Sequence, residues 1–159
     1  MIDLKCVTAE GRPGRLVAAR LKPGQDVVES LYEIIQAYQI RSGTVRAIGS
    51  LRSATVVYPN TMEFSDDPME AAVFHKIEGP VELGMGYGVF GRNQDDSIAM
   101  HIHGLVMDKD GDLRTGNLLP GSAPVLATVE LTIQEFLGME LKPTYDPEWK
   151  FSFLHPTAS

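Results

Sequence analysis

The chain has 159 residues, of which 43% are hydrophobic and 22% are charged, the size and composition of one globular domain with a buried core. No apolar run is long enough for a membrane helix, and the single cysteine, Cys6, excludes an internal disulfide, so we expect a cytoplasmic protein without membrane contacts. The net charge of −7 argues against direct nucleic-acid binding, which usually needs a basic surface.

An amphipathic helix is predicted after a first strand over 15–21. The apolar residues that follow lie on one helical stripe: Val27, Val28, Leu31, Ile34, Ile35 and Tyr38. Asp26 is a suitable N-cap residue, and Glu29 follows three positions later, as in a capping box. The pattern predicts one long helix over 26–39.

The rest of the chain alternates with period two, which is typical of β-strands. We expect strands over 44–51, 53–58, 71–77, 81–89, 97–107 and 123–136, with a polar loop from Pro59 to Met69. In the strand 81–89, the apolar positions Val81, Leu83, Met85, Tyr87 and Val89 alternate with Glu82 and three glycines, which predicts one nearly bare face. The fold class is therefore α+β, a largely antiparallel β-sheet packed with one long amphipathic helix.

Four motifs of known chemistry are excluded by their spacing, residue order or position in the chain. Asp108, Asp110 and Asp112 lack the glycine and glutamate positions of an EF-hand loop, which predicts a charged hairpin turn instead. The segment Gly86–Gly91 fits G-x-G-x-x-G but precedes a turn rather than a helix, which excludes a dinucleotide site. The segment Gly11–Arg15 lacks the core order of an AT-hook, and no serine lies in a nucleophile elbow.

His101 and His103 form the sharpest chemical feature of the sequence. Because they lie two residues apart on a predicted strand, their side chains point to the same face. Neutral imidazoles in that arrangement can take two positions of a tetrahedral zinc site. The alternative is that both histidines pack inward as hydrogen-bonded core residues.

Six short segments occur in an order that resembles a known family. They are Arg20–Asp26 (RLKPGQD), Gly43–Leu51 (GTVRAIGSL), Glu78–Leu83 (EGPVEL), His101–His103 (HIH), Gly116–Gly121 (GNLLPG) and Ala127–Glu130 (ATVE). Together they resemble the plant and prokaryote conserved (PPC) domain family, also called DUF296. We expect a PPC-like domain over residues 1–141 and a C-terminal tail over 142–159.

The resemblance implies a homotrimer that acts as a binding or interaction module, with a DNA-binding or regulatory role by family resemblance. Its partners would be further copies of the chain, and in addition other proteins or a small molecule. An alternative is a metal-dependent, lyase-like enzyme for a small carboxylate metabolite, because the fold also resembles that of acetolactate decarboxylase. No residue pattern identifies a catalytic group, so we favour a non-catalytic role.

Some members of this family hold zinc through three histidines, and the resemblance places Asn117 at the third position. An amide oxygen is a poorer zinc ligand than imidazole, so the implied zinc site of His101 and His103 is degenerate. Arg46 and Glu130 lie in matching strands and join Asn117 as ligand-binding candidates. For Arg46 the alternative, which we favour, is a structural salt bridge. Glu130 could orient the histidines or act as a general base, and the alternative, which we favour, is a buried or interfacial ion pair.

Overall fold

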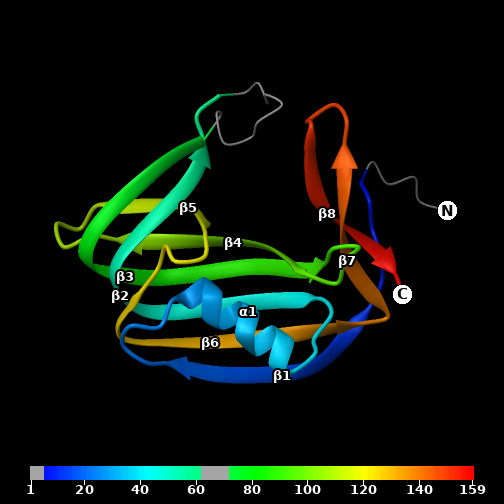
Figure 1. The fold of residues 1–159 in the computed structure, drawn as a ribbon, viewed down its shortest axis with the longest axis horizontal. Coiled ribbons are helices and arrows are strands. Elements are labelled where there is room, and N and C mark those ends of the chain that lie inside the picture. The colour runs from blue at the N-terminus through cyan, green and yellow to red at the C-terminus, as the bar shows by residue number, and fades with distance from the viewer. Residues whose placement is uncertain (1–5, 62–71) are drawn as a thin grey trace.

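The computed structural model describes residues 6–61 and 72–159, which form one helix and eight strands (Figure 1). The elements in chain order are β1 (Arg12–Leu21), α1 (Val27–Ala37), β2 (Gly43–Pro59), β3 (Ala72–Arg92), β4 (Ile98–Met107), β5 (Leu113–Leu118), β6 (Val125–Leu137), β7 (Met139–Asp146) and β8 (Phe151–Ala158). The predicted α+β class with a largely antiparallel sheet is confirmed, although the helix is shorter than the predicted range of 26–39. No helix in the described part of the chain is long and apolar enough to span a membrane.

The main sheet curls until part of it closes on itself. Its six strands lie in the order β1-β6-β2-β3-β4-β5, and every pairing is antiparallel. The far end of β2 pairs in addition with β5, through Val56 with Leu118 and Val57 with Asn117. This second pairing brings β5 back against β2, so the sheet has an inner and an outer face.

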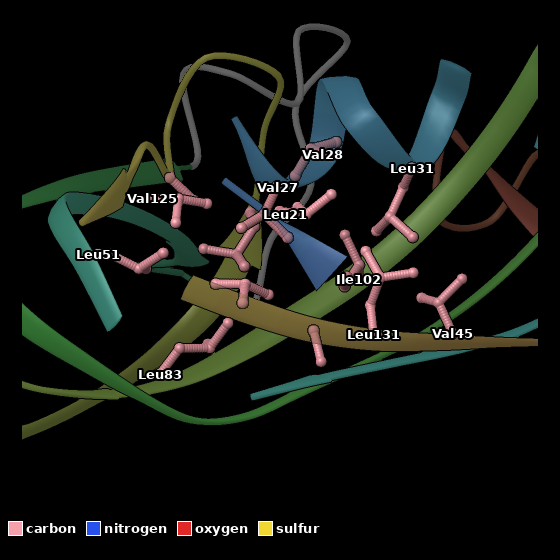
Figure 2. Packing of buried hydrophobic residues seen from close by; sticks show 14 of the residues in the cluster. Leu21, Val27, Val28, Leu31, Val45, Leu51, Leu83, Ile102, Val125 and Leu131 are labelled. Carbon is pink, nitrogen blue, oxygen red and sulfur yellow. The ribbon is translucent and has the colours of Figure 1, made fainter. Parts of the chain in front are cut away.

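Helix α1 closes the inner face of the sheet and completes the core. Val27, Leu31 and Ile35 of the helix are fully buried, as the predicted stripe requires. Figure 2 shows Val27 and Leu31 of the helix packed with side chains from the strands, among them Val45, Ile102 and Leu131. Full burial of each aliphatic side chain of this size contributes about 1.5–3 kcal/mol.

Asp26 joins the start of the helix to the sheet. Its Oδ1 accepts the backbone N–H groups of Val28 at 2.9 Å and Glu29 at 3.0 Å, which confirms the predicted N-cap. Its Oδ2 accepts the N–H of Ala123 at 2.7 Å, just before β6. One buried carboxylate therefore satisfies three backbone donors from two distant segments.

Two pairs of predicted strands are joined into single long strands. The segments 44–51 and 53–58 are parts of β2, and the strand 81–89 continues the one that begins at Ala72 in β3. The inward face of β2 changes between Leu51 and Ala54, which are both buried, because the register with β3 shifts there. The predicted loop runs from Pro59 to Met69. Its positions from 62 onward lie outside the described residues.

A bulge in β3 overturns the prediction that its apolar residues share one face. Leu83 pairs with Val106 but Met85 pairs with Leu105, so Gly84 is an extra residue in β3. Leu83 consequently faces the core, whereas Met85 and Tyr87 are 54% and 46% exposed on the outer face. Gly86 and Gly88, beyond the bulge, face inward.

The C-terminal residues fold into a hairpin, β7–β8, that stands at one end of the sheet (Figure 1). Ser42 Oγ, which is buried, donates to the Phe90 carbonyl at 3.1 Å and accepts the Leu141 N–H at 2.9 Å. A Cβ atom on Gly91 would overlap the Leu141 carbonyl oxygen, so this glycine permits the close approach of β7. The predicted tail, 142–159, lies in this hairpin.

The variant Asp26→Ala should lower the free energy of unfolding by about 3 kcal/mol, because it removes a helix cap and leaves the Ala123 N–H buried without a partner. Asp26→Asn should recover about half of this loss, since its oxygen can still cap α1 but its NH₂ group faces the Ala123 donor. Urea unfolding at fixed protein concentration measures both. Glu33→Ala, at an exposed position in the middle of the helix, is the control, and equal stabilities of all four proteins would contradict the role of Asp26.

Candidate functional site

A row of polar and aromatic side chains crosses the outer face of the sheet. Consecutive strand pairings link Thr132 of β6, Arg46 of β2, Tyr87 of β3, His103 of β4 and Asn117 of β5. Directly opposed residues of antiparallel strands point to the same face. The topology therefore places three of the predicted site residues on one line, although they are far apart in sequence.

The two histidines meet at the β4 part of this row. Both are exposed on the outer face, so the alternative of inward packing is wrong. Their Nε2 atoms are 3.0 Å apart and their rings are nearly perpendicular, with an interplanar angle of 78°. A hydrogen bond between two Nε2 atoms requires that at least one ring is unprotonated at that nitrogen. Partial burial, and then the neighbouring His101, lower the pKa of His103.

Asn117 lies beside the histidine pair with an unsatisfied oxygen. It is the cross-strand partner of His103. Its Oδ1 is closed to solvent and accepts no hydrogen bond from the described residues. Buried amide oxygens nearly always have a partner, so this atom is unusual and is a functional candidate.

The nitrogen donors of His101 and His103 are fewer than a zinc site needs. Two imidazole nitrogens converge, but tetrahedral zinc in proteins usually has at least three strong nitrogen, sulfur or carboxylate ligands. Within the described residues, no group of three or more His, Cys, Asp or Glu side chains could hold a metal ion. The residues present therefore do not fit a tight zinc site built from one chain.

Arg46 and Glu130 share the outer face but do not join the histidines. The Arg46 guanidinium lies over the Tyr87 ring, 5.9 Å from its centroid, and it forms no ion pair with the described residues of this chain. Glu130 accepts a hydrogen bond from Thr128 Oγ1 at 2.8 Å. Strands β2 and β3 separate Glu130 from the histidines, a distance of about 14 Å at the usual strand spacing. Glu130 therefore does not orient either ring.

Two hollows adjoin the histidine pair. A shallow one of about 390 Å³ lies on the outer face next to Met85, Tyr87 and Leu105. A larger cleft of about 580 Å³ lies between the far ends of β2 and β3 and the hairpin β7–β8. Its lining includes Tyr58, Phe151 and Phe153, which sequence analysis did not select, because no local pattern shows where a C-terminal hairpin docks.

These features define a class: a domain with a curled antiparallel sheet, one capping helix and an exposed histidine pair. The family model of the Plants and Prokaryotes Conserved (PCC) domain matches residues 8–137, and the chain belongs to this family. No curated protein matches the chain.

Solved structures with the same fold come from archaea and bacteria. A metal-containing protein from Archaeoglobus fulgidus is 24% identical, with a TM-score of 0.76 and coverage of 95% of this chain and 99% of that one. A plant- and prokaryote-conserved protein from Pyrococcus horikoshii is 17% identical, with a TM-score of 0.77 and coverage of 96% and 99%. A candidate DNA-binding protein from Bacteroides thetaiotaomicron is 17% identical, with a TM-score of 0.73 and coverage of 91% and 96%. At these identities, the likeness establishes the fold.

The pKa of His103 in metal-free protein should lie below the ordinary value of 6.5, and His101→Gln should raise it, because this variant removes a like charge. Since the folded-state pKa is below the unfolded one, the contribution to stability is complete above about pH 6.5 and is lost as the pH falls through the folded-state value. Histidine titration by NMR measures the shift. An unchanged pKa of His103 in His101→Gln would show that the rings do not interact.

Proposed function

We propose that this chain is a non-catalytic interaction module that assembles as a homotrimer through the outer face of its sheet. The observation that carries the proposal is an apolar patch on that face, hereafter the outer patch. It consists of Ile48, Met85, Tyr87, Leu105, Met107 and Leu113, which are 36–59% exposed.

The outer patch is continuous across four strands. Met85 pairs with Leu105, and Met107 pairs with Leu113, so its members are cross-strand neighbours from β3 to β5. Ile48 extends it to β2, next to the bulge that turns Met85 outward. Contiguous apolar surface of this kind is typical of an association site, whereas isolated exposed apolar residues are not. The number of subunits, three, is taken from the family resemblance.

A regulatory role through other proteins agrees best with the charge of the chain. Some structural neighbours are described as candidate DNA-binding proteins. The net charge of −7 disfavours direct contact between this chain and the phosphate backbone. We therefore propose that a role in regulation at DNA would be exerted through partner proteins that the assembled module binds, and not through direct contact of this chain with DNA.

The histidine pair is, in this proposal, a degenerate metal site. One structural neighbour is described as a metal-containing protein, and Asn117 stands where the resemblance implies a third histidine. Two observations disfavour enzymatic activity on a carboxylate metabolite. Glu130 is distant from the rings, and no described carboxylate that could act as a general base lines either hollow beside them. The site keeps two nitrogen donors but not the set that holds zinc tightly.

The wild-type chain should sediment as a trimer at micromolar concentration, and Ile48→Arg should dissociate it. A long, charged side chain at a contact that every subunit repeats should weaken association by about 100-fold or more, even with Glu130 as its cross-strand neighbour. Analytical ultracentrifugation over a concentration series measures the effect. Tyr38→Arg, at a half-exposed position on the opposite side of the sheet, is the control. A wild-type monomer, or a trimer that is unaffected by Ile48→Arg, would refute assembly through the outer patch.

The variant Asn117→His should convert the degenerate site into one that binds zinc stoichiometrically, because it supplies a third imidazole. Elemental analysis after dialysis against a weak chelator should find little zinc in the wild type and about one zinc ion per chain in the variant. A second substitution, His103→Gln, should remove the gain. Stoichiometric zinc in wild-type protein as purified would contradict the assignment of a degenerate site.

A further inference from the structure

The cleft beside the histidine pair has the architecture of a small-molecule site. One wall is formed by Val57, Tyr58 and Pro59, at the end of β2, and the opposite wall by the hairpin. Figure 1 shows the end of β2 and the hairpin β7–β8 extending to the same side of the sheet. The volume of about 580 Å³ lies within the range of pockets that enclose small ligands.

The walls of the cleft are apolar and partly aromatic. Phe151 and Phe153 of β8 are 40% and 37% exposed, and their rings contact edge to face with centroids 5.2 Å apart. Exposed aromatic rings side by side offer a surface on which a flat ligand can stack. The hairpin is held by the buried contacts of Ser42 with Phe90 and Leu141, so this wall is anchored to the sheet.

The floor of the cleft is polar but uncharged. It carries the linked imidazoles of His101 and His103, and the Asn117 amide. No Asp, Glu, Lys or Arg is among the described residues that line the cleft. Among these described residues a charged ligand would lose hydration without gaining an opposite charge, whereas a neutral ligand could exchange hydrogen bonds with the imidazoles.

We infer that this cleft binds a neutral, flat organic molecule whose apolar ring lies between β2 and the hairpin and whose polar group hydrogen-bonds to the histidine pair.

Three small aromatic probes of nearly the same shape test the charge requirement: benzamide, benzoate and benzylamine. Binding to chelator-treated full-length chain is measured by protein NMR shifts during titration near pH 7.5. Benzamide should saturate in the millimolar range expected for a ligand of this size. The anion and the cation should bind about tenfold more weakly or not at all, because the floor offers no counter-charge.

Two hairpin variants localise the binding. Phe153→Ala should weaken benzamide binding about fivefold or more, because it removes one aromatic ring from the wall. Tyr145→Ala, a 62% exposed hairpin residue that does not line the cleft, should leave it unchanged. Equal binding of the three probes, no saturable binding, or an unaltered response of Phe153→Ala would overturn the inference.

Sedimentation of the same samples separates this inference from the proposed assembly. Benzamide binding by a wild-type chain that proves monomeric would leave the cleft site standing and refute only the trimer. Binding that occurs in Ile48→Arg but not in trimeric wild type would show that a neighbouring subunit fills the cleft, and would overturn the small-molecule assignment.

Discussion

The extra residue of β3 at Gly84 determines which surface of this domain is available for association. A strand has only two faces, so one inserted residue exchanges the face of every residue that follows. Beyond the bulge, Met85 and Tyr87 turn outward and small glycines turn toward the core. Tyr87, which pairs with His103, thereby joins the face on which the alternation of β4 already places both histidines. The bulge therefore adds Met85 and Tyr87 of β3 to the face that carries the histidine pair and the apolar residues of β4 and β5.

The curl of the sheet has an equally direct consequence for the cleft. Strand β2 pairs with β5 at its far end, which raises the segment around Tyr58 above the histidines. The hairpin supplies the facing wall, and its approach depends on Gly91, where any side chain would collide with β7. A flat sheet would leave the histidines on an open surface, where a small ligand could bury only one side.

The sequence was most informative where the relevant interactions are local. The helical stripe and the Asp26 cap depend on residues within one or two turns, and both were predicted close to their observed positions. The shared face of His101 and His103 follows from their spacing alone. The bulge at Gly84 and the continuity of β2 and β3 depend on partner strands, so period-two alternation could not reveal them. Likewise, no sequence pattern indicated that Glu130 lies two intervening strands from the histidines, or that Phe151 and Phe153 face them.

The histidine pair connects the two proposed functions physically, because it lines both the shallow hollow on the outer face and the cleft. A ligand that fixes these rings from the cleft side also fixes the part of the outer face that the rings themselves form beside Met85, Tyr87 and Leu105. The ring positions with and without ligand can differ in how well they fit a neighbouring subunit. In that case thermodynamic linkage requires that ligand binding changes the affinity of subunit association, and that association changes the affinity for the ligand by the same factor. A metal held tightly by three histidines would lock the rings and remove this freedom. Asparagine at position 117 therefore suits a site that responds to a ligand better than one that is a permanent structural element.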